Sequence, residues 1–354
     1  MKKKIRVGIV GLGFGLQHIR GFQDCENVEV VAVCDVVGKK VEQIARRFDI
    51  PCVFTNYRDM LKASELDAVS VATPVYLHYS MTLEALDAGK HVLCEKPLAL
   101  NVQQGKRMYE RAQETGLKHM TNFCWRFSPR LFHMKELVDS GYVGSLYHIE
   151  AKWIEGSGAD PGLPLYWRHK KAEGGFGALG DLGVHIIEMV RWIAGDFSRV
   201  CAKTTTLIDR RQDPTSGRVL PTELEDSCMF IAELERNIPA LIHVSRCALF
   251  NSYISLEIYG RDGVLIYQMP QPSVDIPVPR QKTSLVGARK EDDKIEEIPT
   301  PEKLQKIPSS YERFIEGIRS NQPIHPSFLE GLKVQEVADA VVISASERRW
   351  VPIE

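Results

Sequence analysis

Lys96 is the first residue of this chain whose type and position could do chemistry. It follows the apolar run His91–Cys94 and Glu95, and it is followed at once by Pro97. Proline lacks a backbone N–H and disfavours helix in the residue before it, so we expect a strand that stops at Lys96. Ligands bind at the carboxyl edge of an open α/β sheet, where a lysine can direct its charge into a cleft. Taken alone, Lys96 is better explained as a solvated lysine at a strand end.

A second candidate pair lies in a glycine-rich segment of the other half of the chain. Residues 174–183 (GGFGALGDLG) open a predicted helix, in which Asp181 and His185 are four positions apart and project from one face. The positive end of the helix dipole disfavours a protonated histidine, and a neutral imidazole can accept a proton as a general base. The alternative is structural, with Asp181 as an N-cap and His185 as a satisfied core histidine.

The start of the chain has the spacing of a dinucleotide-binding motif. A strand, a glycine turn, a helix and a second strand that ends in an acid are predicted at residues 5–10, 11–15, 16–23 and 28–35. The helix N-terminus offers donors to a pyrophosphate, and Asp35 would bind both ribose hydroxyls and repel the 2′-phosphate of NADP. NAD is therefore preferred, although Lys39 and Lys40 leave NADP open. The usual pattern has its third glycine at the place of Leu16, whereas here it is Gly15.

Strands and helices keep alternating through the first half, which indicates a parallel sheet. Thr73 and Pro74 end one of these strands, at the same edge as Lys96, and His78 begins a helix four residues later. For His78, a surface position at a helix start is an equally good explanation. The further helices are predicted at residues 40–48, 57–63 and 78–88, and the further strands at residues 51–54 and 67–74.

The pattern changes at about residue 126, where strands recur without regular helices between them. These strands are predicted at residues 146–154, 200–208, 227–233, 240–248, 253–260 and 263–268. Residues 270–308 are rich in proline and charge and are expected to form an excursion over the surface, before two helices at 311–320 and 328–348. The fold class is therefore α/β: an NAD-binding Rossmann domain at 1–125 and an α/β domain with a large, mostly antiparallel sheet at 126–354. The C-terminal helix can pack back on the first domain.

Composition excludes several classes of function. The chain has 354 residues and a net charge of −1, from 45 basic and 46 acidic side chains, which gives no electrostatic case for nucleic acid or a membrane surface. No apolar run approaches the roughly 18 residues that a spanning helix needs. The eight cysteines form no C-x-x-C pair, so we expect no metal site and a reduced, cytoplasmic setting. The basic N-terminus is followed by glycines and no cleavage site, so no signal peptide is expected.

Several segments resemble the glucose-fructose oxidoreductase / inositol dehydrogenase / MocA (Gfo/Idh/MocA) family. In the first half they are residues 7–13, residues 67–74 with His78, and residues 89–97 (GKHVLCEKP). In the second half they are Tyr166-Trp167-Arg168, Asp181-x-Gly183-x-His185, and Glu225-Asp226, which we interpret as structural. One departure is Glu188, where the family usually has aspartate. We expect it to alter the bonding around the site rather than the class of reaction.

The resemblance implies a role for each candidate residue. His185 would be the acid/base, Lys96 would hydrogen-bond the reacting hydroxyl, and Asp181 would orient His185 or bind a neighbouring hydroxyl. The expected cofactor-binding residues are Gly11, Gly13, Phe14, Gly15, Asp35, Thr73, Pro74, His78, Glu95, Lys96 and Arg168. The expected substrate-binding residues are Arg126, Trp153, Trp167, Arg168, Asp181 and His185. Buried core positions explain Trp153 and Trp167 equally well.

The leading hypothesis is an NAD-dependent oxidoreductase that acts on a ring hydroxyl of a sugar, glycoside or cyclitol. Reduction of a keto-sugar is the alternative for the physiological direction, because hydride transfer is reversible. Hypotheses from other classes are a non-catalytic NAD-binding sensor and a transferase or hydrolase that uses bound NAD transiently. A sensor would be expected to lack Lys96 or His185, both of which this chain keeps. The resemblance also implies a homodimer or homotetramer through the exposed face of the C-terminal sheet.

Overall fold

The structure, a computed structural model, describes residues 4–63, 65–270 and 283–353. The chain divides into two units, one of residues 1–124 and 308–335 and the other of residues 125–307 and 336–354. The first change of unit lies one residue before the predicted boundary. The return of the chain to the first unit was predicted only as a C-terminal helix that packs back on the first domain. In the structure, residues 308–335, which we call the return segment, belong to the first unit.

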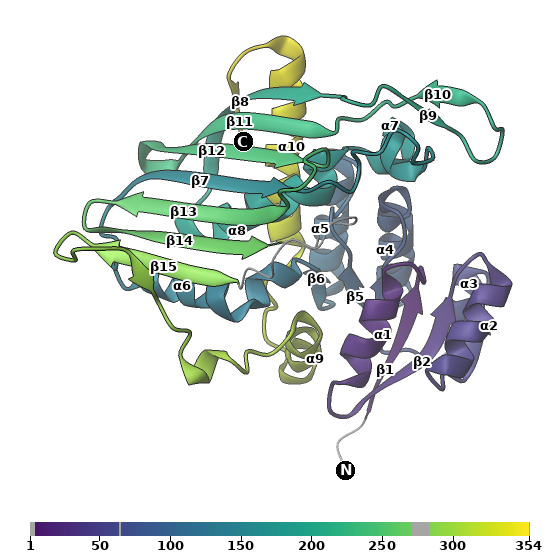
Figure 1. The fold of residues 1–354 in the computed structure, drawn as a ribbon. Coiled ribbons are helices and arrows are strands. Elements are labelled where there is room, and N and C mark those ends of the chain that lie inside the picture. Colours follow the sequence, from purple (N-terminus) through teal and green to yellow (C-terminus); the bar gives the residue numbers. More distant parts are fainter. Residues whose placement is uncertain (1–3, 64, 271–282, 354) are drawn as a thin grey trace. The chain divides into compact units, whose positions relative to one another are not determined.

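A six-stranded parallel sheet is the centre of the first unit (Figure 1). Its strand order is β3-β2-β1-β4-β5-β6, so the order reverses between β1 and β4, where ligands bind in such sheets. The strands are short and largely buried, which explains their near-continuous apolar runs. Their bounds are β1 (Ile5–Val10), β2 (Val28–Cys34), β3 (Cys52–Phe54), β4 (Ala68–Val71), β5 (His91–Cys94) and β6 (His119–Thr121).

Helices connect these strands, and the chain returns to the same unit near its C-terminus. The helices are α1 (Gly15–Gln23), α2 (Gly38–Arg47), α3 (Tyr57–Ala63), α4 (His78–Asp87), α5 (Val102–Thr115) and α9 (Ser310–Ser320), with the short helix η1 (Val75–Leu77). The prediction that a strand runs to Lys96 is wrong by two residues. The last ladder pairs of β5 join Cys94 to Val71 and Thr121, so Glu95 and Lys96 lie just beyond the sheet edge.

A nine-stranded sheet is the centre of the second unit, in the order β16-β15-β14-β13-β7-β12-β11-β8-β17. β7 and β12 are parallel and the other described pairs are antiparallel, so the predicted mostly antiparallel sheet is confirmed. The strands are β7 (Leu146–Ile154), β8 (Phe197–Thr205), β11 (Ser227–Leu234), β12 (Ile238–Ser245), β13 (Tyr253–Gly260), β14 (Gly263–Pro270), β15 (Ser284–Arg289), β16 (Glu296–Glu297) and β17 (Val351–Pro352).

Helices α6 and α8 lie on one side of this sheet (Figure 1). The helical segments of the second unit are η2 (Cys124–Phe127), α6 (Pro129–Asp139), η3 (Trp167–His169), α7 (Lys171–Gly174), η4 (Leu179–Gly183), α8 (Val184–Ala194), η5 (Glu235–Asn237) and η6 (Glu302–Leu304). The helix α10 (Phe328–Glu347) begins in the first unit and ends in the second. Among the helices that the structure describes, none combines the length and apolar character that crossing a membrane requires.

Two features of the second unit differ from the predictions. The expected surface excursion at 270–308 contains β15, which pairs with β14 and extends the sheet, while its residues 271–282 lie outside the described residues. A short hairpin of β9 (Arg210–Gln212) and β10 (Val219–Pro221) was not predicted. Both departures concern strands of three to six residues, which are too short for a periodic pattern to stand out from flanking prolines and charges.

Candidate active site

Three glycines of the turn between β1 and α1 have different structural roles. Gly11 has φ +87°, and a Cβ there would lie 2.6 Å from the backbone of Ala72, so no other residue fits. A Cβ on Gly13 would meet nothing within 4 Å, which leaves this backbone open to a ligand. Gly15 begins α1, and a Cβ there would lie 3.2 Å from Ile9. Gly15 therefore provides the close packing of helix on strand that the third glycine of the usual motif provides one residue later.

Asp35 ties the end of β2 to this turn. Its Oδ2 accepts the Leu12 N–H at 2.8 Å, its Oδ1 accepts the Val37 N–H at 3.2 Å, and Lys40 Nζ lies 3.1 Å from Oδ2. Burial would raise the pKa of Asp35, but these three donors outweigh it and lower the pKa, so the carboxylate is ionised at neutral pH. The open backbone at Gly13, the N-terminus of α1 and an ionised Asp35 fit NAD. Phe14 is 54% exposed beside them.

His78 joins the loops that follow β4 and β5. Its Nε2 lies 2.9 Å from the Thr73 carbonyl oxygen, and its Nδ1 lies 2.9 Å from that of Pro97. The side chain is 1% exposed, so the alternative of a surface histidine is wrong. Burial lowers the pKa of His78 against the pull of the two carbonyls, and a neutral imidazole can donate to only one of them. His78 thus links the loop containing Thr73 and Pro74 to the loop containing Lys96.

Glu95 is a buried carboxylate at the end of β5. Its Oε1 lies 2.9 Å from His18 Nε2 and accepts from Asn122 Nδ2 at 2.6 Å, and its Oε2 accepts the backbone N–H of Lys96 at 3.2 Å. Burial would raise the pKa of Glu95, but the hydrogen bond and charge of His18, the charge of Lys96 and the Asn122 amide lower it to about 2. His18 and Asn122 were not predicted as site residues. The available signal was a histidine on the buried face of α1.

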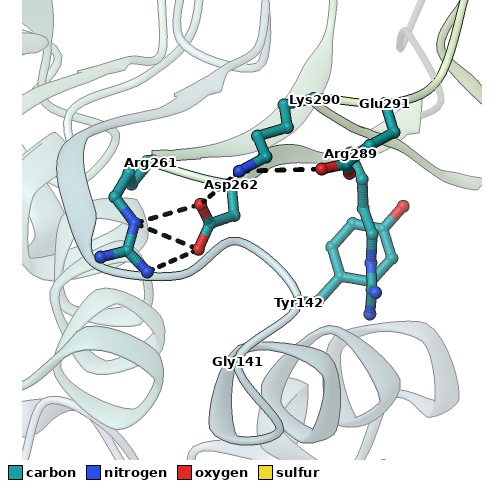
Figure 2. A pocket seen from close by; sticks show the side chains of 7 residues that line it. All are labelled: Gly141, Tyr142, Arg261, Asp262, Arg289, Lys290 and Glu291. Carbon is teal, nitrogen blue, oxygen red and sulfur yellow. Dashed lines mark hydrogen bonds and ion pairs between the residues drawn. The ribbon is translucent and has the colours of Figure 1, made fainter.

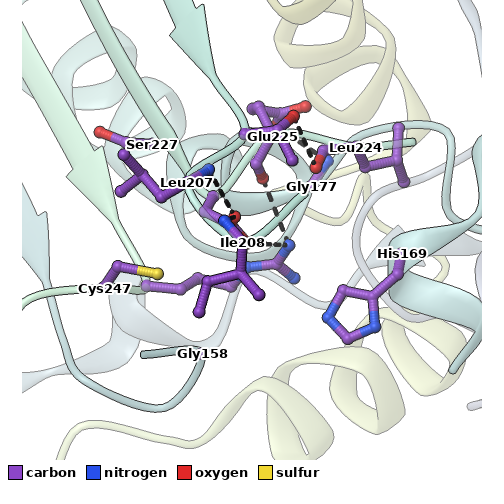
Figure 3. Close-up of polar contacts among 12 residues, drawn as sticks. Gly158, His169, Gly177, Leu207, Ile208, Leu224, Glu225, Ser227 and Cys247 are labelled. Atoms are coloured by element: carbon purple, nitrogen blue, oxygen red, sulfur yellow. Dashed lines mark hydrogen bonds and ion pairs between the residues drawn. The ribbon is translucent and has the colours of Figure 1, made fainter. Parts of the chain in front are cut away.

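Asp181 and His185 lie on consecutive turns at the start of one helical segment. Asp181 belongs to the π-helical turn η4, and His185 follows in the first turn of α8. Glu225 holds the beginning of this segment, because its Oε1 accepts the N–H groups of Gly177 at 2.8 Å and Leu179 at 2.9 Å (Figure 3). Burial raises the pKa of Glu225 despite these donors. A Cβ on Gly177 would lie 1.9 Å from the Glu225 carbonyl oxygen, so the segment can pass there only as glycine.

Two tryptophans fix the His185 ring. Trp153 stacks on it with ring centroids 5.5 Å apart at 28°, and Trp125 meets it edge-on at 6.4 Å and 86°. His185 is 6% and Trp153 is 7% exposed. Trp153 therefore contacts the predicted acid/base directly, and its contact with a sugar stays a prediction.

Arg126 and Arg168, two of the expected substrate-binding residues, each have a carboxylate partner in this unit. Arg168 Nε lies 3.5 Å from Asp181 Oδ1, and its guanidinium lies 4.3 Å from the centre of the Trp167 ring. Arg126 Nε donates to Glu188 Oε1 at 2.6 Å. Glu188 is 1% exposed, so this pair is buried at the position where the family usually has aspartate. Arg168 therefore forms an ion pair with Asp181, and Arg126 is hydrogen-bonded to Glu188.

A buried ion pair supports the interpretation of Glu225-Asp226 as structural. Asp226 Oδ1 lies 3.3 Å from Arg246 Nη2, with side chains 0% and 2% exposed. Its Oδ2 accepts the backbone N–H groups of Leu207 at 2.9 Å and Ile208 at 3.0 Å (Figure 3). These bonds anchor the chain around β8 and β11 beneath the helix that Glu225 holds.

One surface pocket of the second unit lies apart from the predicted site residues. A surface pocket of about 450 Å³ is lined by none of the predicted site residues, and its Asp262 is already paired with Arg261 at 2.8 Å and Lys290 at 3.7 Å (Figure 2). Within residues 4–63, 65–270 and 283–353, no group of three or more His, Cys, Asp or Glu side chains could hold a metal ion. Lys96 belongs to the first unit, and Asp181 and His185 belong to the second.

Comparisons with known proteins cover nearly the whole chain. The profile of a family described as "Oxidoreductase family, NAD-binding Rossmann fold" matches residues 5–123, and that of the "GFO/IDH/MocA C-terminal domain" matches residues 132–266. Levoglucosan dehydrogenase of Pseudarthrobacter phenanthrenivorans is 28% identical over 99% of this chain and 98% of its own. Inositol 2-dehydrogenase of Rhizobium meliloti is 25% identical over 99% of both. A solved structure of levoglucosan dehydrogenase in complex with NADH and L-sorbose has a TM-score of 0.89 at 26% identity, over 99% of both chains.

Proposed function

The chain belongs to the Gfo/Idh/MocA oxidoreductase family, and from this premise we propose that it is an NAD-dependent dehydrogenase of a ring hydroxyl on a sugar, glycoside or cyclitol. One observation carries the proposal: the glycine turn that Asp35 binds and the lysine that follows β5 lie at the carboxyl edge of the same parallel sheet. The relatives named for levoglucosan and inositol dehydrogenase support the substrate class.

The chemistry is divided between two residues of this chain. Bound nicotinamide would supply the hydride acceptor. Lys96 donates a hydrogen bond to the reacting hydroxyl, so its ammonium stabilises the alkoxide that develops as the proton leaves. His185 receives that proton, held in orientation by Trp153 and Trp125. Reduction of a keto-sugar is the same sequence in reverse, with His185 as the proton donor.

Asp181 and Arg168 have a supporting role in this proposal. The Arg168 guanidinium, whose Nε lies 3.5 Å from Asp181 Oδ1, balances the charge of that carboxylate. Asp181 would accept a hydrogen bond from a neighbouring hydroxyl or orient His185. Arg168 and Trp167, stacked on each other, would contact substrate or cofactor from the loop before α7. Arg126 contributes through Glu188, because its guanidinium is committed to that buried carboxylate.

The remaining proposed cofactor residues lie at or next to the glycine turn. Thr73 and Pro74 follow β4 beside the glycine turn, and His78 holds them to the loop after β5. Phe14 precedes α1 and would pack against the bound nucleotide. Asp35 favours NAD over NADP, because its negative charge repels a 2′-phosphate.

The exposed face of the nine-stranded sheet is proposed to join copies of this chain into a homodimer or homotetramer. Met229, Ile231 and Leu241 project from it and are 51%, 48% and 40% exposed. All eight cysteines lie in the described part of the chain as free thiols, which supports a reducing, cytoplasmic setting.

The experiment is a panel of sugars, glycosides and inositols offered with NAD and with NADP, followed by absorbance of the reduced cofactor. We expect turnover of at least one polyol, with NAD preferred. Lys96→Ala should reduce turnover to a small residual rate while NAD affinity, measured by calorimetry, is retained. Lys106→Ala, which removes an exposed lysine of α5, should change neither. Binding of NAD without turnover of any polyol would favour the sensor instead.

A further inference from the structure

Five polar side chains, which we call the Glu95 cluster, meet inside the first unit: His18, Ser70, Glu95, Asn122 and Tyr311. They come from α1, β4, the ends of β5 and β6, and α9, which are far apart in the sequence. His18 and Ser70 are 0%, Asn122 is 2% and Glu95 is 6% exposed. A buried carboxylate is costly for folding unless it is well hydrogen-bonded, and apolar side chains of similar size could fill this space at less cost. Stability alone therefore does not explain why these polar side chains are buried together.

His18 connects the cluster to the sheet. Its Nδ1 lies 2.6 Å from Ser70 Oγ and its Nε2 lies 2.9 Å from Glu95 Oε1, so both ring nitrogens are engaged and the ring orientation is fixed. The Asn122 amide donates to the same Glu95 oxygen at 2.6 Å. Glu95 Oε1 is thus held from two sides, by the nucleotide-binding helix and by the residue that follows β6.

Tyr311, in the return segment of residues 308–335, packs against the cluster. Its ring lies against Gly21, where a Cβ would be 2.1 Å away, and meets the rings of His18 at 5.3 Å and Phe22 at 5.1 Å. Burial and the charge of Glu95 raise the pKa of Tyr311, so its phenol is neutral. Because Gly21 has no side chain, the Tyr311 ring fits against α1 and blocks movement of His18 away from Glu95.

Lys96 follows Glu95 directly, so the cluster adjoins the backbone of the proposed catalytic lysine. Glu95 Oε2 accepts the Lys96 N–H at 3.2 Å, and the backbone just before it is held by the bonds from Glu95 N–H to Val71 O at 2.9 Å and from Asn122 N–H to Cys94 O at 2.8 Å. The same carboxylate thus touches the backbone from which the lysine side chain projects. The positive charge of Lys96 also helps to keep Glu95 ionised.

We propose that His18 and Asn122 are positioning residues that fix the Glu95 carboxylate, and that Glu95 in turn fixes the placement of Lys96 for its reaction. This rests on the role of Lys96 in the proposed function. Glu95 then acts through Lys96 rather than as a cofactor contact, because its carboxylate is occupied within the cluster.

The test compares Glu95→Gln, His18→Gln and His18→Leu with Glu330→Gln. Glu330 is a matched control, because it forms another His–Glu pair in the first unit, with His325 at 2.6 Å. Each variant should lower the melting temperature, but only those of the cluster should lower kcat, by about 10-fold to 100-fold for a misplaced group, with KM and NAD affinity nearly unchanged. His18→Gln, which keeps a donor toward Glu95, should retain more activity than His18→Leu. Equal kcat in Glu95→Gln and wild type would overturn the proposal.

A double-mutant cycle separates positioning from independent effects. Glu95→Gln added to Lys96→Ala should cost no further turnover, whereas an additive loss would show that Glu95 does not act through Lys96. If Lys96→Ala keeps full turnover, the proposed function fails instead. The rate of chemical acetylation of Lys96, measured by mass spectrometry, is a readout that needs no turnover. This rate, relative to that of the exposed Lys106, should rise in Glu95→Gln. An unchanged Lys96 rate contradicts the positioning role whatever the substrate.

Discussion

Asp35 is the residue on which the choice of cofactor depends. We expect Asp35→Asn to raise the KM for NAD by about 10-fold to 100-fold, the range for losing a hydrogen bond to a charged group, and to leave the KM for NADP unchanged or lower. The physical reason is that the amide neither attracts both ribose hydroxyls nor repels a 2′-phosphate. The measurement is kcat/KM with each cofactor. Glu42→Gln, which removes an exposed carboxylate of α2, should keep the wild-type ratio; an unchanged ratio in Asp35→Asn would assign selectivity elsewhere.

Glu95 makes the acid stability of the protein predictable. Its pKa is about 2 in the folded protein and 4.5 in the reference state, so its stabilising effect is complete above pH 4.5 and is lost as pH falls toward 2. The shift corresponds to about 3 kcal/mol at neutral pH. Glu95→Gln should therefore melt well below wild type at pH 7, and the gap should narrow by pH 3 in calorimetry. A gap that stays constant between these pH values would mean that Glu95 is not ionised in the fold.

Sequence spacing alone can group candidate residues that lie close together along the chain. Asp181 and His185 are four residues apart, and Asp35 follows the glycine turn at a set distance, so their grouping could be read from the chain. His18 and Glu95 are 77 residues apart, and Arg126 and Glu188 are 62 apart. Such pairs form only when distant elements pack together, so a local sequence pattern does not predict them.

At the scale of elements, the segment that carries Asp181 and His185 depends on one glycine. A methyl group on Gly177 would collide with the Glu225 carbonyl at 1.9 Å, so Gly177→Ala must move the start of η4 away from Glu225. We expect a loss of about 1–3 kcal/mol, typical of overpacking, together with lower turnover. Gly105→Ala in α5 is the control, since its Cβ would lie an ordinary 3.5 Å from Leu332 and alanine favours helix. The measurements are thermal unfolding and kcat; wild-type values for both in Gly177→Ala would contradict this account.

Element bounds followed from periodicity where the segment is regular. The predicted bounds of β1, α3, β7 and β13 match the structure, because each alternates or repeats clearly between turn residues. β15 and the β9–β10 hairpin were missed, since strands this short gain their stability from neighbours in the sheet. Strand ends shifted for the same reason: β5 stops where its partners β4 and β6 stop.

At the scale of the whole molecule, the sequence indicated two domains but not how the chain is shared between them. The change of pattern near residue 126 marks the first crossing, one residue from that in the structure. The return of residues 308–335 to the first unit rests on tertiary contacts, such as Tyr311 against Gly21. Neither residue is unusual in its own helix, so periodicity could not reveal the return.

The open face of the nine-stranded sheet gives the last prediction. Ile231 lies directly across from Leu241 on β12 and from Cys201 on β8, so apolar side chains of three strands form one patch on this face. A monomer would leave this patch in water, whereas a second copy would cover it. A charge at its centre should oppose that contact, so Ile231→Asp should lower the mass measured by light scattering.

The control for this prediction is a substitution to aspartate at an exposed apolar residue outside the large sheet. Val219 on β10 is 54% exposed in the hairpin, away from the paired strands of the large sheet, so Val219→Asp should leave the oligomer intact. Both variants should keep the melting behaviour of a folded chain, because both positions are already exposed. A wild-type protein that has the mass of one chain, or an Ile231→Asp variant that keeps the wild-type mass, would show that this face is not where copies meet.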